Sequence, residues 1–304
     1  MSAIKTVVAT INGQQYTLTL NSSTGAYEAS ITAPTVTSWN VNDDHYYPVS
    51  ITATDISGNS TTINDSDATY GESLRLIVKE TVKPVITFVS PTTGAGLTNN
   101  KPTIKVNITD EGSGIALSSF KLLIDSSTIT FDKCTFKDIA GGYEVSYTPT
   151  TALSDGSHTV TANVSDNDGN AATAASITFK VDTVPPTLTV TAPTDDSYTN
   201  NNTCTVSGTT NDAHSSPVTV KITVNGSDAG AVTVQTNGSF SKAITLANGE
   251  NTIVITATDA LGKTTSVTRT VTLDTSAPEF TEVTIAPNPV NCGATYTITV
   301  KLSE

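Results

Sequence analysis

The chain has 304 residues and carries 28 acidic against 15 basic side chains, for a formal net charge of −13. Only two of the basic residues are arginines, Arg75 and Arg269, and they lie far apart in the sequence. A surface that follows phosphates needs clustered Lys and Arg, so we expect no nucleic-acid partner. No apolar run reaches about 18 residues, so we also expect no membrane insertion.

The composition favours strands and turns. Thr, Val, Ile, Ser, Asn and Gly are frequent, aromatic residues make up 6%, and no window shows an apolar stripe of helical period. The three cysteines, Cys134, Cys204 and Cys292, fall in different predicted domains, which excludes a disulfide within a domain. An unpaired set of this kind fits folding in a reducing cytosol. The first residues show no secretion signal, so we expect assembly in a host cytoplasm.

Taken in chain order, one strand–turn phrase occurs three times: TATDISGN (52–59), NVSDNDGN (163–170) and TATDALGK (256–263). Three proline-bearing joints of one design separate the copies. These are KETVKP, VDTVPP and LDTSAP, which begin at residues 79, 181 and 273. Short proline linkers restrict a joint, so we expect a semi-rigid rod. The predicted domain boundaries are 1–82, 83–183, 184–275 and 276–304.

The first predicted domain lacks its first two strands. Residues 10–31 match residues 223–244 of the third, with Gly25 over Gly238, so the domain holds only strands C to G. Its E–F and F–G loops are long. The E–F loop carries the aromatic set Trp39, His45, Tyr46 and Tyr47. Loop aromatics serve protein interfaces and sugar stacking, so this set is a candidate binding patch. Alternatively, Trp39 fills the joint to the next domain.

The second and third domains each read as seven short strands with regular Gly-bearing turns, which is typical of a Greek-key sandwich. In the second, His158 at the start of strand F is expected on the surface. The strand A phrases that end in Ser-Pro or Ala-Pro, the Asn-Gly hairpin at 225–226 and the ATDxxGN turn resemble bacterial immunoglobulin-like domains. This resemblance implies an all-β chain of tandem sandwiches, as in bacterial surface adhesins and virion proteins of tailed phages.

The fourth segment, 276–304, reads as strands A and B alone. Five apolar residues alternate along it: Val283, Ile285, Tyr296, Ile298 and Val300. One expectation is that these two strands complete the first domain of another copy, because open edges accept added strands. Two alternatives stand beside it. The first domain closes locally while the tail packs on the third, or the natural chain continues past Glu304.

Carboxylates at the domain joints are the other candidate site. Loop geometry brings Asp212 and Asp259 towards the linker residue Asp182, and Asp110, Glu111, Asp166 and Asp168 towards Glu80 in the second domain. Oxygen clusters of this kind could bind Ca²⁺. Hairpin turns call for the same Asn, Asp and Gly residues, so we expect no cofactor and no calcium requirement.

No catalytic triad and no His–Cys metal motif can be assembled from the three His and three Cys. We therefore expect a non-enzymatic structural or adhesion protein. Its partners would be other copies of itself or other virion proteins, and a glycan or protein of the host cell surface is a further candidate. The resemblance implies a phage virion, on the tail or the particle surface. The alternatives are a bacterial surface adhesin or stalk fragment, located at the cell surface, and a carbohydrate-binding accessory module.

Overall fold

The structure, a computed structural model, describes residues 3–303, which form six β-sheets. Three short 3-10 turns are its helical segments: η1 (Ser38–Asn40), η2 (Gly71–Leu74) and η3 (Phe131–Lys133). None of the described helical segments has the length and apolarity to cross a membrane. The chain divides into two compact units, residues 1–181 and 182–304. The fold class, all-β with tandem immunoglobulin-like sandwiches, is confirmed.

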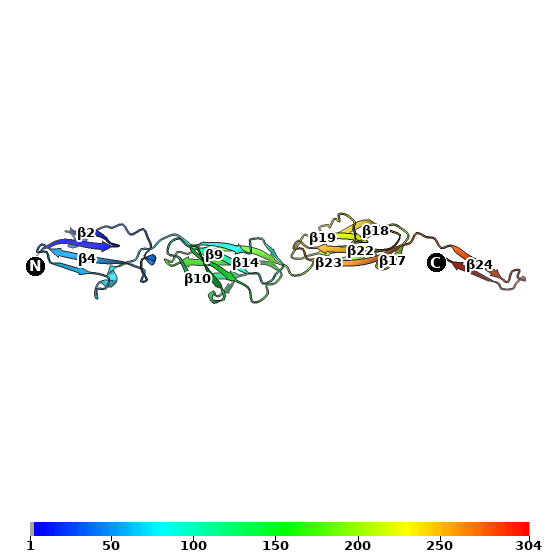
Figure 1. Cartoon of the computed structure of the whole chain (residues 1–304), viewed down its shortest axis with the longest axis horizontal. Helices are drawn as coiled ribbons and strands as arrows, with labels where there is room; N and C mark the ends of the chain where they lie inside the picture. Colours follow the sequence, from blue (N-terminus) through cyan, green and yellow to red (C-terminus); the bar gives the residue numbers. More distant parts are fainter. Residues whose placement is uncertain (1–2, 304) are drawn as a thin grey trace. The chain divides into compact units, whose positions relative to one another are not determined.

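The first repeat is a single sheet with strand order β3-β2-β1-β4-β5, to which β6 adds by pairing with β4 (Figure 1). The strands are β1 (Ile4–Ile11), β2 (Gln14–Asn21), β3 (Ala26–Glu28), β4 (Tyr47–Asp55), β5 (Ser60–Ile63) and β6 (Arg75–Leu76). Among the described residues of this repeat, only four apolar ones are buried: Val7, Ala9, Tyr47 and Leu74. One layer of sheet cannot enclose a core by itself, and this repeat has no second sheet among the described residues.

The second repeat has two sheets, ordered β11-β10-β14-β15-β8 and β12-β13-β9-β7. A core cluster of fifteen buried apolar residues includes Phe179, Ile104 and Ile108. The strands are β7 (Val85–Ser90), β8 (Gly96–Leu97), β9 (Ile104–Thr109), β10 (Ile115–Ile124), β11 (Ser127–Ile129), β12 (Thr135–Ile139), β13 (Gly142–Tyr147), β14 (Gly156–Asp166) and β15 (Ala175–Val181). Strands neighbouring in space but not in sequence give the Greek-key connections expected of this sandwich.

The third repeat also has two sheets, ordered β16-β18-β21 and β17-β23-β22-β19-β20, around a cluster of eleven buried apolar residues. The strands are β16 (Thr187–Ala192), β17 (Ser197–Thr199), β18 (Thr203–Asn211), β19 (Thr219–Val224), β20 (Ser227–Asp228), β21 (Ser239–Thr245), β22 (Gly249–Thr258) and β23 (Thr264–Leu273). The alternation and turn residues of this domain predict seven strands, the fourth of which, strand D, spans residues 230–235. The prediction of strand D is wrong. That segment is irregular apart from one bridge, Val234 to Phe240.

The last segment is a two-stranded hairpin of β24 (Phe280–Ala286) and β25 (Thr297–Leu302). All described residues from 274 to 303 are exposed, including every residue of both strands. An isolated hairpin is marginally stable in water, so this segment presents two strands without a core to cover.

Strand F is β4 in the first repeat, β14 in the second and β22 in the third. One position of this strand is buried in each repeat and holds a polar group: Tyr47, His158 and Asn251 are 3%, 4% and 0% exposed. Each ties its strand to the preceding loop. The Tyr47 hydroxyl donates to the Val36 carbonyl (3.0 Å), His158 Nε2 lies 2.7 Å from the Ser154 carbonyl, and Asn251 Nδ2 donates to the Ala247 carbonyl (2.7 Å). The expectation that His158 lies on the surface is wrong.

His158 is missed because its burial depends on a partner from another strand. Asp125, at the turn after β10, places its Oδ2 2.6 Å from His158 Nδ1. Burial alone would lower the pKa of His158, but its bonds to Asp125 and to the Ser154 carbonyl raise it more, so the pKa of the imidazole is raised. Both ring nitrogens face acceptors, which favours the doubly protonated imidazolium.

Candidate assembly site

The first repeat presents an uncovered sheet face. In the third repeat, β21 pairs along its whole length with β18, the strand B of that domain. The matching residues of the first repeat, 26–32, form only the short β3, which pairs with β2, and residues 29–36 after it form no strand. This segment has no strand B to pair with among the described residues, which leaves Ile31 and its neighbours beside an open sheet.

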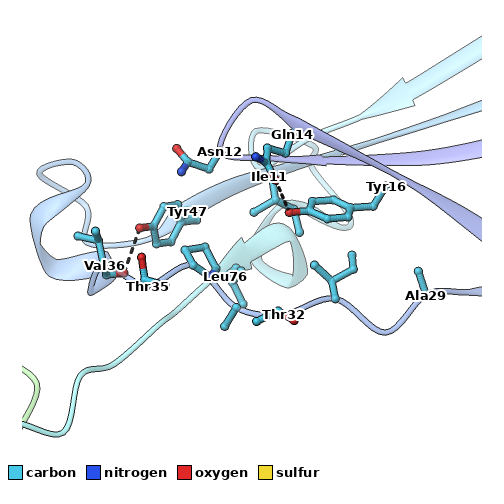
Figure 2. A pocket seen from close by; sticks show the side chains of 13 residues that line it. Ile11, Asn12, Gln14, Tyr16, Ala29, Thr32, Thr35, Val36, Tyr47 and Leu76 are labelled. Atoms are coloured by element: carbon cyan, nitrogen blue, oxygen red, sulfur yellow. Dashed lines mark hydrogen bonds between the residues drawn. The ribbon is translucent and has the colours of Figure 1, made fainter.

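A pocket of about 610 Å³ lies between this segment and the sheet (Figure 2). Tyr16 and Tyr47 project into it from β2 and β4, and Leu76 reaches it from β6. The hydroxyl of Tyr16 donates to Gln14 Oε1 at 3.0 Å. The remaining lining residues are Ile11, Asn12, Ala29, Ile31, Thr32, Ala33, Pro34, Thr35 and Val36. Apolar and polar groups contribute almost equally to the wall, so an occupant would need both apolar side chains and hydrogen-bonding groups.

The hairpin β24–β25 has an apolar face that no other segment covers among the described residues. In its register Val283 lies opposite Val300, and Ile285 lies opposite Ile298. Paired residues of an antiparallel ladder point to the same face, so these four side chains share one side of the hairpin. They are between 44% and 58% exposed. Tyr296, at 54% exposed, precedes β25 on the same alternation. The five predicted assembly residues are thus all exposed.

The predicted aromatic patch divides into parts with different environments. Trp39 stacks on His45, with ring centroids 3.6 Å apart and an angle of 6° between the planes, and His45 Nδ1 lies 2.8 Å from the Trp39 carbonyl. Tyr46 donates to Asp65 Oδ2 at 2.8 Å, and Arg75 lies over its ring. Tyr47 is buried and belongs to the core, so it is not part of an exposed patch.

The loop that carries Trp39 contacts the second repeat through its polar residues. Thr37 Oγ1 donates to Asp168 Oδ2 at 2.5 Å, and Asn40 Nδ2 donates to the Gly112 carbonyl at 2.9 Å. No hydrogen bond or ring contact of Trp39 to the second repeat occurs in the described part of the chain. Thr37 and Asn40, which the sequence did not single out, therefore make side-chain hydrogen bonds from this loop to the second repeat.

The carboxylates expected to meet do so. One oxygen each from Asp182, Asp212 and Asp259 lies within 4.8 Å of the other two, and all three residues are buried. Glu80, Asp110 and Asp166 form a second group of the same size. Asp168 is not part of it, because its Oδ2 accepts from Thr37 and from the Glu80 amide. Glu111 is exposed and also lies outside the group.

Comparison with known proteins agrees with this architecture. Residues 84–162 match the family of bacterial Ig domains, and residues 186–275 match the family described as glucodextranase, domain B. A segment of 116 residues is 40% identical to Bacillopeptidase F of Bacillus subtilis (strain 168). The match covers 37% of this chain and 8% of that protein, so the chain spans a small part of its relative.

Among solved structures, the fibronectin(III)-like modules of Clostridium thermocellum CbhA align with 62% of this chain and 94% of their own, at 18% identity and a TM-score of 0.35. Immunoglobulin domains 1–5 of Sidekick-1 align with 99% of this chain and 60% of theirs, at 10% identity and a TM-score of 0.42.

Proposed function

Because the chain consists of tandem bacterial immunoglobulin-like domains, we propose that it is a non-enzymatic structural or adhesion protein whose copies join by completing one another's sandwiches. The hairpin β24–β25 of one copy would cover the open face of the first repeat in the next. The observation that supports this most directly is the exposed apolar face of the hairpin, which has the strand A and B pattern of β16 and β18, the two strands that form one sheet with β21 in the third repeat.

The hairpin lacks a cover for its apolar side chains, and residues 29–36 lack a strand to pair with. Burying a Val or Ile side chain contributes about 1.5–3 kcal/mol, and four such side chains lie on one face of the hairpin. On the other partner, residues 29–36 offer backbone groups outside any ladder. Strand addition supplies hydrogen bonds to such groups while side chains enter the pocket. The open face of the first repeat and the apolar face of the hairpin are different surfaces. The contact between copies is therefore heterologous and produces rings or filaments.

The test uses the full chain with two tail variants. Ile298→Asp places a charge on the apolar face, whereas Thr299→Asp places the same charge on the opposite face of β25. We expect the wild type to form larger species as concentration rises, Ile298→Asp to remain monomeric and Thr299→Asp to associate normally. Sedimentation velocity distinguishes these outcomes. A wild type that stays monomeric at high concentration contradicts the proposal.

A matched pair in the first repeat tests the other partner. Ile31 lines the pocket, whereas its neighbour Ser30 does not. Ile31→Asp should abolish association and Ser30→Asp should preserve it. If both variants associate as the wild type does, the hairpin docks elsewhere.

A second candidate, carbohydrate binding, follows from the stacked pair Trp39 and His45. An indole that is partly exposed on a loop provides the flat face on which sugars stack. Residues 186–275 also match a domain named for glucodextranase. Glycan-array binding that Trp39→Ala abolishes, with β24–β25 variants unaffected, would support it.

The particle itself is proposed from the family resemblance: a tailed-phage virion, assembled in the host cytoplasm, with other virion proteins or a host surface glycan or protein as partners. A bacterial cell surface, with the chain as an adhesin or stalk, is the alternative. The neighbouring genes distinguish the two, because tail genes accompany the first and a sortase or secretion locus accompanies the second.

A further inference from the structure

Two groups of three carboxylates have the same construction in successive repeats. Each group contains one acidic residue from the linker, one that follows strand B (β9 or β18) and one from the end of strand F (β14 or β22). The six residues are Glu80, Asp110 and Asp166 in the second repeat, and Asp182, Asp212 and Asp259 in the third. Within each group the three ligand oxygens lie within 4.8 Å of one another.

In the third repeat, turn bonding accounts for only one oxygen of each carboxylate. Asp182 Oδ1 accepts from the Val184 amide, Asp212 Oδ1 accepts from two amides, and Asp259 Oδ1 accepts from the Leu261 and Lys263 amides at 2.8 and 2.9 Å. The Oδ2 atoms of Asp182 and Asp259 are buried without a hydrogen-bond partner. These residues are 0% and 5% exposed, so their free oxygens do not face bulk solvent.

In the second repeat, Asp110 shows the same division. Asp110 Oδ2 accepts from the amides of Gly112 and Gly114 at 3.0 and 2.8 Å, while its Oδ1 is buried without a partner. Glu80 Oε2 accepts from the Val82 amide, two residues along, as Asp182 does from Val184. Asp166 accepts from the Asn170 amide with Oδ1 and from the Asn170 side chain with Oδ2, and Glu80 Oε1 lies 3.5 Å from Asn170 Nδ2. The second group therefore contains one buried oxygen without a partner, Asp110 Oδ1, and the third-repeat group contains two.

Buried like charges this close repel one another strongly unless something neutralises them. Within residues 3–303, none of the six carboxylates forms an ion pair with Lys, Arg or His. The nearest candidate, Lys263, donates its ammonium group to the backbone carbonyl of Asp182. The equivalent Asn170 makes the corresponding bond to the Glu80 carbonyl and is uncharged. A side-chain cation therefore does not explain both groups.

We propose that each group is a Ca²⁺ site that fastens the linker residue to the loops of the repeat that follows it. All the donors are carboxylate oxygens, and hard divalent cations take such ligands. The donors come from three irregular segments, which suits the flexible coordination of Ca²⁺ better than the strict octahedron of Mg²⁺. Turn chemistry led us to expect no calcium requirement. The unpartnered second oxygens reverse that expectation.

The test is a Ca²⁺ titration of the full chain after treatment with EDTA, followed by calorimetry and thermal unfolding. We expect two Ca²⁺ per chain and a melting temperature that rises by several degrees, since a ligand that binds only the folded state stabilises it. Absence of binding heat together with an unchanged melting temperature would overturn the proposal. Mg²⁺ binding as tight as that of Ca²⁺ would overturn the assignment to calcium.

Matched variants locate the sites. Asp182→Asn and Asp110→Asn should each remove one bound Ca²⁺, and the double variant should remove both. Asp55→Asn is the control, because Asp55 has the same turn in the first repeat but belongs to neither group. Direct titration of the wild type keeps the proposal testable if a variant fails to fold. Lys263→Met that leaves two bound Ca²⁺ supports the proposal. A wild type with one Ca²⁺ that gains a second in Lys263→Met would show that Lys263 occupies the third-repeat site.

Discussion

Strands β9 and β25 have the same alternation of residues and opposite environments. Ile104, Val106 and Ile108 of β9 are at most 1% exposed, because β9 lies between β7 and β13 and faces a second sheet. Ile298 and Val300 of β25 are 56% and 44% exposed, because β25 has only β24 beside it. The sequence pattern therefore specifies which face of a strand is apolar, whereas the presence of a second layer decides whether that face is buried.

The largest expected effect comes from a charge on each of these strands. Val106→Asp buries a carboxylate without a partner in a closed core, which costs several kcal/mol and should unfold the second repeat. Ile298→Asp should leave the melting temperature of dilute protein unchanged, because the side chain already contacts water. Thermal unfolding at low concentration measures both. Equal destabilisation by the two variants would show that β25 is buried within its own chain.

Two glycines that align in sequence, Gly25 and Gly238, compare the open first repeat with the closed third repeat. A Cβ on Gly238 would lie 2.2 Å from the carbonyl oxygen of Thr210 in β18, whereas a Cβ on Gly25 would meet no atom within 4 Å. Both residues have positive φ, 81° and 72°, so each alanine variant carries a similar backbone penalty of about 1–2 kcal/mol. Gly238→Ala should cost about 1–3 kcal/mol more, from overpacking.

The Gly25 variant also reports on assembly. If a hairpin from another copy supplies the missing strand B, Gly25→Ala should weaken association, while the dilute monomer should lose only the backbone penalty of about 1–2 kcal/mol. Denaturant unfolding of the monomer and sedimentation of the concentrated protein separate these two effects. Unchanged association would show that no strand occupies the position that β18 has in the third repeat.

The buried imidazole gives the next effect. The raised pKa of His158 means that its stabilisation is fully present below the ordinary pKa of 6.5 and is lost as pH rises through the folded-state pKa. Burial alone would raise the pKa of Asp125, but its bonds to His158 and the Thr159 amide lower it more. The stabilisation by Asp125 is present above its ordinary pKa of 3.8 and is lost as pH falls through the lowered value. The pair therefore stabilises between these two folded-state pKa values.

His158→Asn is the matched variant for this effect, because the third repeat has Asn251 at the same position. The free energy of unfolding of the wild type should fall as the pH rises above the ordinary imidazole pKa of 6.5 and through the raised folded-state pKa of His158, and the variant should show a smaller fall. An identical pH dependence in both proteins would mean that another group is responsible.

Sequence patterns were sufficient to predict most strands and one carboxylate group, but not the shortest strands or the burial of two polar side chains. Alternation and turn residues located most strands, and loop order brought Asp182, Asp212 and Asp259 together, since both depend on local signals. The short parallel strands β8 and β17 were not predicted, because two or three residues show no period. The burial of His158 and Tyr47 was also missed. Their partners, Asp125 and the Val36 carbonyl, lie 33 and 11 residues earlier in the chain and outside the strand of either residue, so strand alternation does not reveal them.

Substitutions on the polar faces of β9 and β25 should have similar effects on the melting temperature, and these effects should be the smallest of those predicted. Lys105 of β9 lies 3.4 Å from Glu144, and Lys301 of β25 pairs with Glu282. The lysines are 41% and 66% exposed, and exposed ion pairs contribute about 0–1 kcal/mol. Lys105→Ala and Lys301→Ala should therefore both change the melting temperature by no more than a few degrees. If Lys301→Ala instead abolished association, the partner would cover the polar face of the hairpin, and the apolar face would need another explanation.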